Sequence, residues 1–179
     1  MPKFIPTLKP VLLAGLITAI SQPVLAQPDW DAINEETLRH FRALLQFDTS
    51  DPPGRELPAA EYIRDVLEAE GFEVEMLANN DERPNVVTRL KGNGSKEPLL
   101  IMAHTDTVNV DPAKWTFPPF SATIDNGYVY GRGAVDDKDN LAAGLMVMLE
   151  LKRQGIKLDR DVIFLAESGE EGATEFGIE

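Results

Sequence analysis

Apolar residues recur along this chain with two different periods, and each period predicts one kind of element. Between residues 31 and 47 they recur at helical spacing, which predicts an amphipathic helix. A second helix is predicted around residues 60–67, and Gly71 is well placed to end it in the left-handed conformation. A third, largely apolar helix is predicted over residues 141–152, closing near Gly155.

Other segments alternate with a period of two or are apolar throughout, as β-strands are. Residues 72–76 alternate strictly, as in a half-buried strand, and residues 85–90 predict a neighbouring strand. The unbroken apolar run at 99–103 predicts a strand buried on both faces of a sheet, and residues 161–166, apolar after Asp161, predict a second buried strand. Asp125-Asn126-Gly127 lies between apolar runs and predicts a β-hairpin. Together these elements predict an α/β fold.

Ionisable residues follow three of these elements. His104 and Asp106 end the first apolar strand, and the glutamate pair at 170–171 follows the second. The aspartate pair at 136–137 lies in a glycine-flanked loop that opens the third helix. If the two strands are parallel, all three clusters converge on one edge of the sheet, which is where open α/β folds place their sites.

Carboxylates gathered in one crevice repel each other unless a cation neutralises them. One histidine with several carboxylates is a ligand set for zinc, manganese or cobalt. One ring nitrogen of His104 can bind the metal while Asp106 holds the proton on the other. Taken singly, the loop at 131–138 could bind phosphate, and the pair at 170–171 could be a solvated helix start. The three clusters together favour a metal site.

Composition narrows the chemistry further. The chain has 30 acidic against 17 basic residues and a formal charge of −13, which argues against a nucleic-acid partner. It has no cysteine, so a metal would have to be bound by histidine and carboxylates. Of its two histidines, His40 lies between Arg39 and Arg42 on the first helix and is predicted to be a surface residue, not a ligand.

Residues 1–26 have the pattern of a secretory signal peptide. Lys3 and Lys9 give a positive start, residues 11–20 an apolar core, and Val24-Leu25-Ala26 a small-residue cleavage site. The alternative is a retained membrane anchor, although the apolar core is short for a span. We expect cleavage after Ala26, a secreted or periplasmic location, and no membrane association afterwards.

Three motifs, taken in order, resemble those of the M20 metallopeptidases: His104-Thr-Asp106, the segment 131–138 and Glu170-Glu171-Gly172. Segments 47–54 and 69–74 fit the family as well. The resemblance implies a three-layer α/β/α domain with a mostly parallel central sheet. It also implies that residues 27–179 are the N-terminal portion of the catalytic domain, so that the fold is incomplete.

The resemblance assigns roles to five residues. His104 binds the first metal, Asp136 bridges both metals, and Glu171 binds the second. Asp106 orients His104, and Glu170 is the general base acting on a water between the metals. The implied cofactor is Zn²⁺, two ions per complete site, with Co²⁺ or Mn²⁺ as alternatives.

The resemblance also implies a reaction and a backbone feature. The reaction is hydrolysis of an amide bond in a small peptide or N-acyl amino acid, as by a carboxypeptidase. The peptide bond between Asp136 and Asp137 is expected to be cis. Asp139-Asn140 stands where many members have Gly-Gly, which resembles the Gly-X carboxypeptidase-like branch.

Other ligands and the lid or dimerisation domain of the family occur later than the position of Glu179. We therefore expect this chain alone to be inactive, and the full-length protein to be a candidate homodimer. Two alternative functions stay open. One is an M28-type aminopeptidase, which also uses Asp-Asp and Glu-Glu pairs. The other is a non-catalytic exported binding protein with a relic metal pocket.

Overall fold

The computed structural model describes residues 27–177, so the signal peptide predicted at 1–26 lies outside the described residues. The α-helices are α1 (Trp30–Leu45), α2 (Leu57–Ala69) and α3 (Lys138–Arg153). Two 3₁₀ turns, η1 (Pro112–Lys114) and η2 (Thr174–Phe176), lie in the connections. Within the described residues, no helix combines the length and apolar character that a membrane span requires.

The main sheet has four strands in the order β2-β3-β8-β4. They are β2 (Val74–Leu77), β3 (Asn85–Leu90), β8 (Val162–Glu167) and β4 (Leu99–His104). β4 runs parallel to β8, whereas β3 is antiparallel to both β2 and β8. A short parallel pair joins β1 (Ser50–Asp51) to β5 (Thr107–Val108). A hairpin joins β6 (Thr123–Asp125) to β7 (Tyr128–Tyr130).

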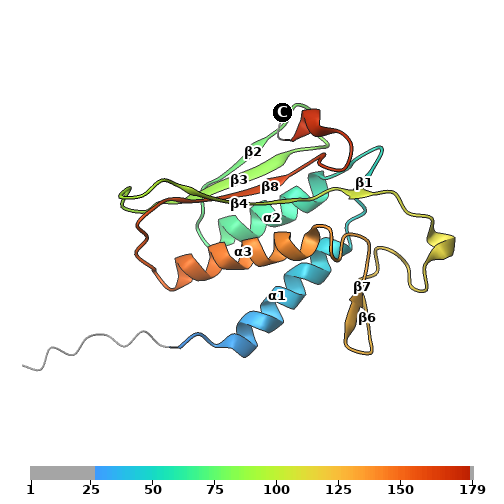
Figure 1. Ribbon diagram of the computed structural model, residues 1–179, viewed down its shortest axis with the longest axis horizontal. Helices are drawn as coiled ribbons and strands as arrows, with labels where there is room; N and C mark the ends of the chain where they lie inside the picture. The colour runs from blue at the N-terminus through green and yellow to red at the C-terminus, as the bar shows by residue number, and fades with distance from the viewer. Residues whose placement is uncertain (1–26, 178–179) are drawn as a thin grey trace, which may run out of the picture.

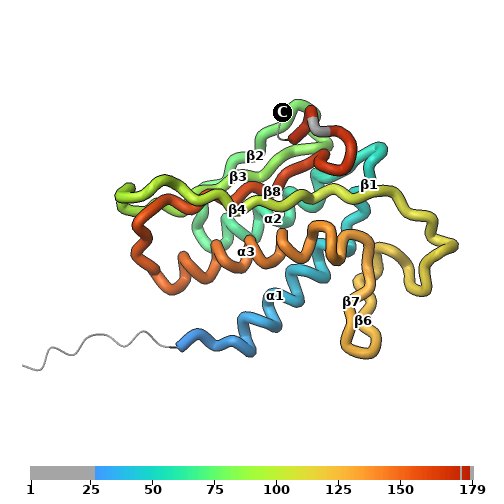
Figure 2. The backbone as a smooth tube through the Cα atoms, viewed as in Figure 1, coloured from blue at the N-terminus to red at the C-terminus, as the bar shows by residue number. Residues whose placement is uncertain are grey.

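Figure 1 shows α2 and α3 on one face of the sheet, with α1 packed on the far side of α3. The backbone trace in Figure 2 shows the same two-layer arrangement with α1 beneath it. Fully buried Ile63, Leu67, Leu145, Leu149 and Phe164 fill the space between the helices and the sheet. The predicted α/β class is confirmed. Among the described residues, however, the sheet is mixed, and the helices cover one of its faces.

Local sequence signals account for several element ends. Gly71 has φ +74°, and its amide donates to the Glu68 carbonyl oxygen at 2.8 Å, so it ends α2 as predicted. Asn126 and Gly127 both have positive φ, which is the backbone of the tight turn predicted for the β6–β7 hairpin. Helix α1 ends at Leu45, two residues before the predicted end.

The prediction that the first apolar strand is buried on both faces was wrong for the described chain. Leu99, Leu100 and Met102 of β4 are 40–49% exposed. Among the described strands, β4 lies at the sheet edge and pairs with β8 alone. Since helices cover only one face there, an apolar sequence does not by itself provide a cover for the other face.

The prediction that His40 is a surface residue was also wrong. The residue is only 1% exposed, and Tyr62 from α2 packs against its ring. His40 Nδ1 and the Tyr62 hydroxyl share a hydrogen bond of 2.7 Å. Burial of the ring and the nearby Arg39 guanidinium lower the pKa of His40 below its ordinary value of 6.5. The folded chain therefore disfavours the protonated form of this histidine.

This burial predicts a pH-dependent loss of stability. The unfolded chain protonates His40 at its ordinary pKa, whereas the folded chain resists the proton, so stability is present above pH 6.5 and falls as the pH drops through that value. His40→Gln removes the titration. Denaturant unfolding at about pH 7.5 and 5.5 should show a larger loss for the wild type than for the variant. Equal losses would contradict the neutral, buried state of His40.

Candidate metal centre

The parallel register of β4 and β8 brings the C-terminal ends of these strands to the same edge of the sheet. Ala103 pairs with Ala166, and His104 pairs with Glu167. Just beyond them, the Thr105 amide donates to the Glu167 carbonyl oxygen at 2.7 Å, and the Thr105 hydroxyl donates to the same oxygen at 2.8 Å. The chain after β8 therefore leaves the sheet beside the chain after β4, as the two apolar runs predicted.

The buried carboxylate of Asp106 joins these two strand ends. Its Oδ1 accepts a hydrogen bond from the Glu170 amide at 3.1 Å, and its Oδ2 accepts one from the Glu171 amide at 2.9 Å. The His104 ring also contacts Asp106: its Nδ1 lies 3.1 Å from the Asp106 carbonyl oxygen and 3.5 Å from Asp106 Oδ1. Asp106 thus contacts both the histidine and the loop that carries the glutamate pair.

The loop before α3 brings Asp136 to the same place. The peptide bond between Asp136 and Asp137 is cis, as the resemblance implied. Asp137 Oδ2 accepts from the His104 amide at 3.3 Å, and its Oδ1 accepts from Asn140 Nδ2 at 2.5 Å. Sequence reasoning missed this tie between the loop and the end of β4, because it treated Asp137 only as half of an acidic pair.

The side chain of Lys138 anchors the loop before α3 to the segment that follows α1. It is fully buried, and Nζ donates to the Phe47 carbonyl oxygen at 2.9 Å. Burial lowers the pKa of Lys138 to about 8, although nearby carboxylates favour its charge. The backbone turns at Gly133, where φ is +81° and an added Cβ would lie 2.8 Å from Thr107 Cγ2. Glycine is therefore required at this point of the loop.

Three of the predicted site residues, His104, Asp136 and Glu171, each offer one ligand atom, and these atoms all lie within 4.8 Å of one another. His104 Nε2 lies 3.0 Å from Asp136 Oδ1 and 3.8 Å from Glu170 Oε2. Asp136 and Glu170 are 76% and 54% exposed, so the cluster opens to solvent. His40 contacts Glu36 and Tyr62 instead and is not one of these residues.

The electrostatics of the cluster show crowded negative charge. Burial of the His104 ring opposes its protonation, but Asp106 and Asp136 outweigh burial and raise the pKa of His104 to about 9. Burial would raise the pKa of Asp106 as well, yet His104 and the Glu171 amide lower it overall. Partial burial and the Asp136 carboxylate raise the pKa of Glu171. A positive charge among these groups is therefore favourable.

The donor set fits a divalent ion such as zinc. Zinc binds histidine nitrogen and carboxylate oxygen at about 2.0–2.2 Å, so donors of one ion lie roughly 3.4 Å apart. The 3.0 Å between His104 Nε2 and Asp136 Oδ1 is already close to that spacing. Glu171 lies within reach of both atoms, so only small side-chain adjustments separate this arrangement from a coordination shell.

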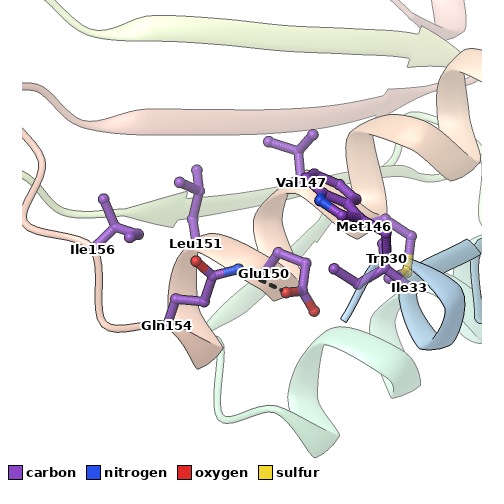
Figure 3. A pocket seen from close by; sticks show the side chains of 8 residues that line it. All are labelled: Trp30, Ile33, Met146, Val147, Glu150, Leu151, Gln154 and Ile156. Carbon is purple, nitrogen blue, oxygen red and sulfur yellow. Dashed lines mark hydrogen bonds between the residues drawn. The ribbon is translucent and has the colours of Figure 1, made fainter. Parts of the chain in front are cut away.

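A separate apolar groove between α1 and α3, with a volume of about 260 Å³, does not contain comparable chemistry (Figure 3). It is lined by Trp30, Ile33, Met146, Val147, Glu150, Leu151, Gln154 and Ile156. Its two polar side chains bond to each other, since Gln154 Nε2 donates to Glu150 Oε2 at 2.9 Å. The candidate site is therefore the cluster at the sheet edge.

Comparison with known proteins points the same way. Residues 100–179 match the model of peptidase family M20/M25/M40. The chain is 39% identical over 145 residues to N-formyl-4-amino-5-aminomethyl-2-methylpyrimidine deformylase of Halalkalibacterium halodurans, covering 79% of the chain and 34% of that protein. It is 36% identical over 118 residues to a probable succinyl-diaminopimelate desuccinylase of Staphylococcus epidermidis, covering 65% of the chain and 28% of the relative.

A solved structure is similar as well. The M20 family metallo-carboxypeptidase Sso-CP2 of Sulfolobus solfataricus matches with a TM-score of 0.66 and 30% identity, over 76% of this chain and 31% of that one. The chain thus spans about a third of the length of the relatives it matches. The matched region includes His104, Asp136 and Glu171, the three residues whose ligand atoms converge. This chain belongs to the M20 family of peptidases.

Proposed function

We propose that this chain supplies part of the active site of a zinc-dependent hydrolase that cleaves an amide bond in a small peptide or N-acyl amino acid. The convergence of His104, Asp136 and Glu171 at one sheet edge carries the proposal. A divalent ion bound there would polarise a substrate carbonyl and make water more acidic. Because Asp136 and Glu170 are exposed, a substrate can approach this edge from solvent.

The chain's own residues would divide the work by position. Asp106 holds the His104 ring through Nδ1, so Nε2 faces the cluster. Glu171 and Asp136 contribute carboxylate oxygens as ligands. Glu170 lies beside them, with Oε2 3.8 Å from His104 Nε2 and more than half of its side chain exposed. In the proposed reaction Glu170 accepts a proton from the attacking water and delivers it to the leaving amine.

The number of ions is part of the proposal. Asp136 faces His104 through Oδ1, and its exposed carboxylate has a second oxygen that could serve another ion. Three donor residues do not fill two coordination shells, so we propose that the remaining ligands come from sequence outside residues 27–177. Zn²⁺ is our preferred metal, with Co²⁺ or Mn²⁺ as alternatives, because the donors are one imidazole and carboxylates.

The names of the similar proteins support an amide substrate without choosing one. They describe a deformylase, a probable desuccinylase and a metallo-carboxypeptidase. The proposed metal site is compatible with each of these reactions, because the roles that we propose for its residues concern activation of water and not recognition of a particular acyl group. We therefore propose the reaction class, with a carboxypeptidase-like cleavage as its preferred form.

Size-preserving substitutions in the glutamate pair test the proposed roles in the complete protein encoded by the source gene. Glu170→Gln removes the proton acceptor and should lower turnover by about 10²–10⁴ while bound zinc is unchanged. Glu171→Gln replaces a charged ligand by a neutral amide and should lower the zinc content itself. Elemental analysis and turnover of N-acyl amino acids and dipeptides, measured for each variant, separate the two roles.

Glu35→Gln is the matched control, since Glu35 is exposed on α1 and is not part of the cluster. It should leave both zinc content and turnover unchanged. Loss of zinc in Glu170→Gln with retention in Glu171→Gln would reverse the two assignments. Unchanged turnover in both variants would show that this pair is not catalytic.

We also propose export, on the sequence of residues 1–26. Cleavage after Ala26 would leave Gln27 as the new N-terminus, directly before the first described helix. Mass spectrometry of protein from the exporting host should find a chain that begins at Gln27. A membrane-bound species with Met1 still in place would contradict the proposal.

A further inference from the structure

Arg83 is a buried cation that the proposed reaction does not use. Its side chain is only 3% exposed, and its main partner, Glu56, is fully buried. Arg83 Nε donates to Glu56 Oε2 at 3.0 Å, and Nη2 donates to Glu56 Oε1 at 2.7 Å. Nη2 also donates to Asp51 Oδ2 at 2.9 Å. Buried charges of this kind are costly unless they are fully paired, so their arrangement indicates a specific requirement.

The same arginine contacts the segment that carries the glutamate pair, residues 168–176, here called the site loop. The guanidinium carbon lies 4.7 Å from the centroid of the Phe176 ring, at the far end of the loop. At the near end, Ser168 Oγ donates to the Arg83 carbonyl oxygen at 2.9 Å. An added Cβ on Gly169 would lie 3.4 Å from Arg83 Nη2. Arg83 therefore contacts both ends of the site loop, the near end by a hydrogen bond to its backbone carbonyl and the far end by its guanidinium group.

Asn85, two residues further on, reinforces this contact. Its Oδ1 accepts from the Ser168 amide at 3.0 Å, and its Nδ2 donates to the Phe176 carbonyl oxygen at 2.6 Å. The short stretch from Arg83 to Asn85 thus holds the loop at the two points where it begins and ends. Glu170 and Glu171 lie between these points.

On its other side the ion pair reaches the segment next to Asp106. Asp51 belongs to β1, whose Ser50 pairs with Thr107 of β5, the residue that follows Asp106. Gly54 lies against the guanidinium so closely that a Cβ there would overlap it. Asp106 in turn accepts hydrogen bonds from the backbone amides of Glu170 and Glu171. Arg83 and Asp106 therefore brace the site loop from two sides.

We propose that Arg83 is a positioning residue that fixes the site loop so that Glu171 stays within reach of the ion shared with His104 and Asp136. The inference rests on the proposed metal-binding function. It adds a residue that touches none of the three ligands and acts through the loop between Ser168 and Phe176.

The test separates positioning from mere stability. Arg83→Met alone would leave the Glu56 carboxylate buried without its partner, which is strongly destabilising. The double variant Arg83→Met/Glu56→Gln removes the two most deeply buried charges and leaves Asp51, whose side chain is 9% exposed. The fold should therefore be retained while the guanidinium contact with Phe176 is lost. Arg83→Lys is a second variant. It keeps the positive charge but loses the bidentate hydrogen bond to Glu56 and the packing of the guanidinium on Phe176.

Two quantities, amide hydrogen exchange and zinc affinity, are measured on the full chain of each variant and of the wild type. In metal-free protein, the amides of Glu170 and Glu171 should exchange hydrogen at least about tenfold faster in the double variant, because the loop that presents them to Asp106 loses the guanidinium contact at Phe176 and opens more often. The affinity for Zn²⁺, measured by titration with the metal, should fall by about 10–100-fold, the usual effect of losing a partner that orients a ligand. Arg83→Lys should shift both quantities in the same direction.

Two controls isolate the effect. Glu56→Gln alone keeps the contacts of Arg83 with Ser168 and Phe176, so amide exchange and zinc affinity should stay near the wild-type values. Arg153→Met removes an arginine paired with Glu36 of α1 and with Glu70, the residue that follows α2. It should lower the unfolding midpoint without changing zinc affinity.

Wild-type amide exchange and zinc affinity in the double variant would overturn the proposal and leave Arg83 with a purely structural role. If the wild-type chain binds no zinc, the proposed metal-binding function fails. Amide exchange at Glu170 and Glu171 then still decides whether Arg83 positions the loop, so the two failures are distinguishable.

Discussion

The candidate site depends on a single buried carboxylate. Both oxygens of Asp106 accept backbone amides from the chain after β8, while the residue also holds the His104 ring at the end of β4. The parallel register of the two strands makes this possible, since it brings His104 level with Glu167. Loss of the Asp106 side chain would remove both of these hydrogen bonds between the loop of Glu170 and Glu171 and the end of β4.

The charge balance follows from this arrangement. Asp106, Asp136 and Glu171 surround one imidazole, and in the absence of a metal ion a proton on His104 reduces their repulsion, as its pKa of about 9 indicates. A divalent cation would supply more positive charge at the same place, which is why the donor set favours a metal. The exposed Glu170 lies beside the imidazole and is not one of the three residues whose candidate ligand atoms converge.

Much of the fold and the site was predictable from sequence, because local patterns encode it. The helices, the hairpin and the apolar strands follow from periodicity and turn residues, and the polar residues after β4 and β8 pointed to one sheet edge. Burial was less predictable. The exposure of β4 and the burial of His40 depend on which elements pack against them, and the sequence of β4 or α1 alone does not contain that information.

The bracing of the site was not predictable for the same reason. Arg83 and Glu56 are 27 residues apart and form no motif, and Ser168 is further still. Asp137 was visible as half of an acidic pair, yet its bond to the His104 amide depends on the loop backbone. The candidate ligands are thus encoded by short motifs, whereas the residues that contact them and their loops are brought together only by the fold.

The central claim is that His104, Asp136 and Glu171 form one metal site, and anomalous diffraction from crystals grown with zinc tests it most directly. Data collected on both sides of the zinc absorption edge locate the ion independently of any activity. The account predicts an anomalous peak about 2.0–2.2 Å from His104 Nε2 and from carboxylate oxygens of Asp136 or Glu171. A zinc peak bound elsewhere, with this cluster unchanged and empty at saturating zinc, would contradict it.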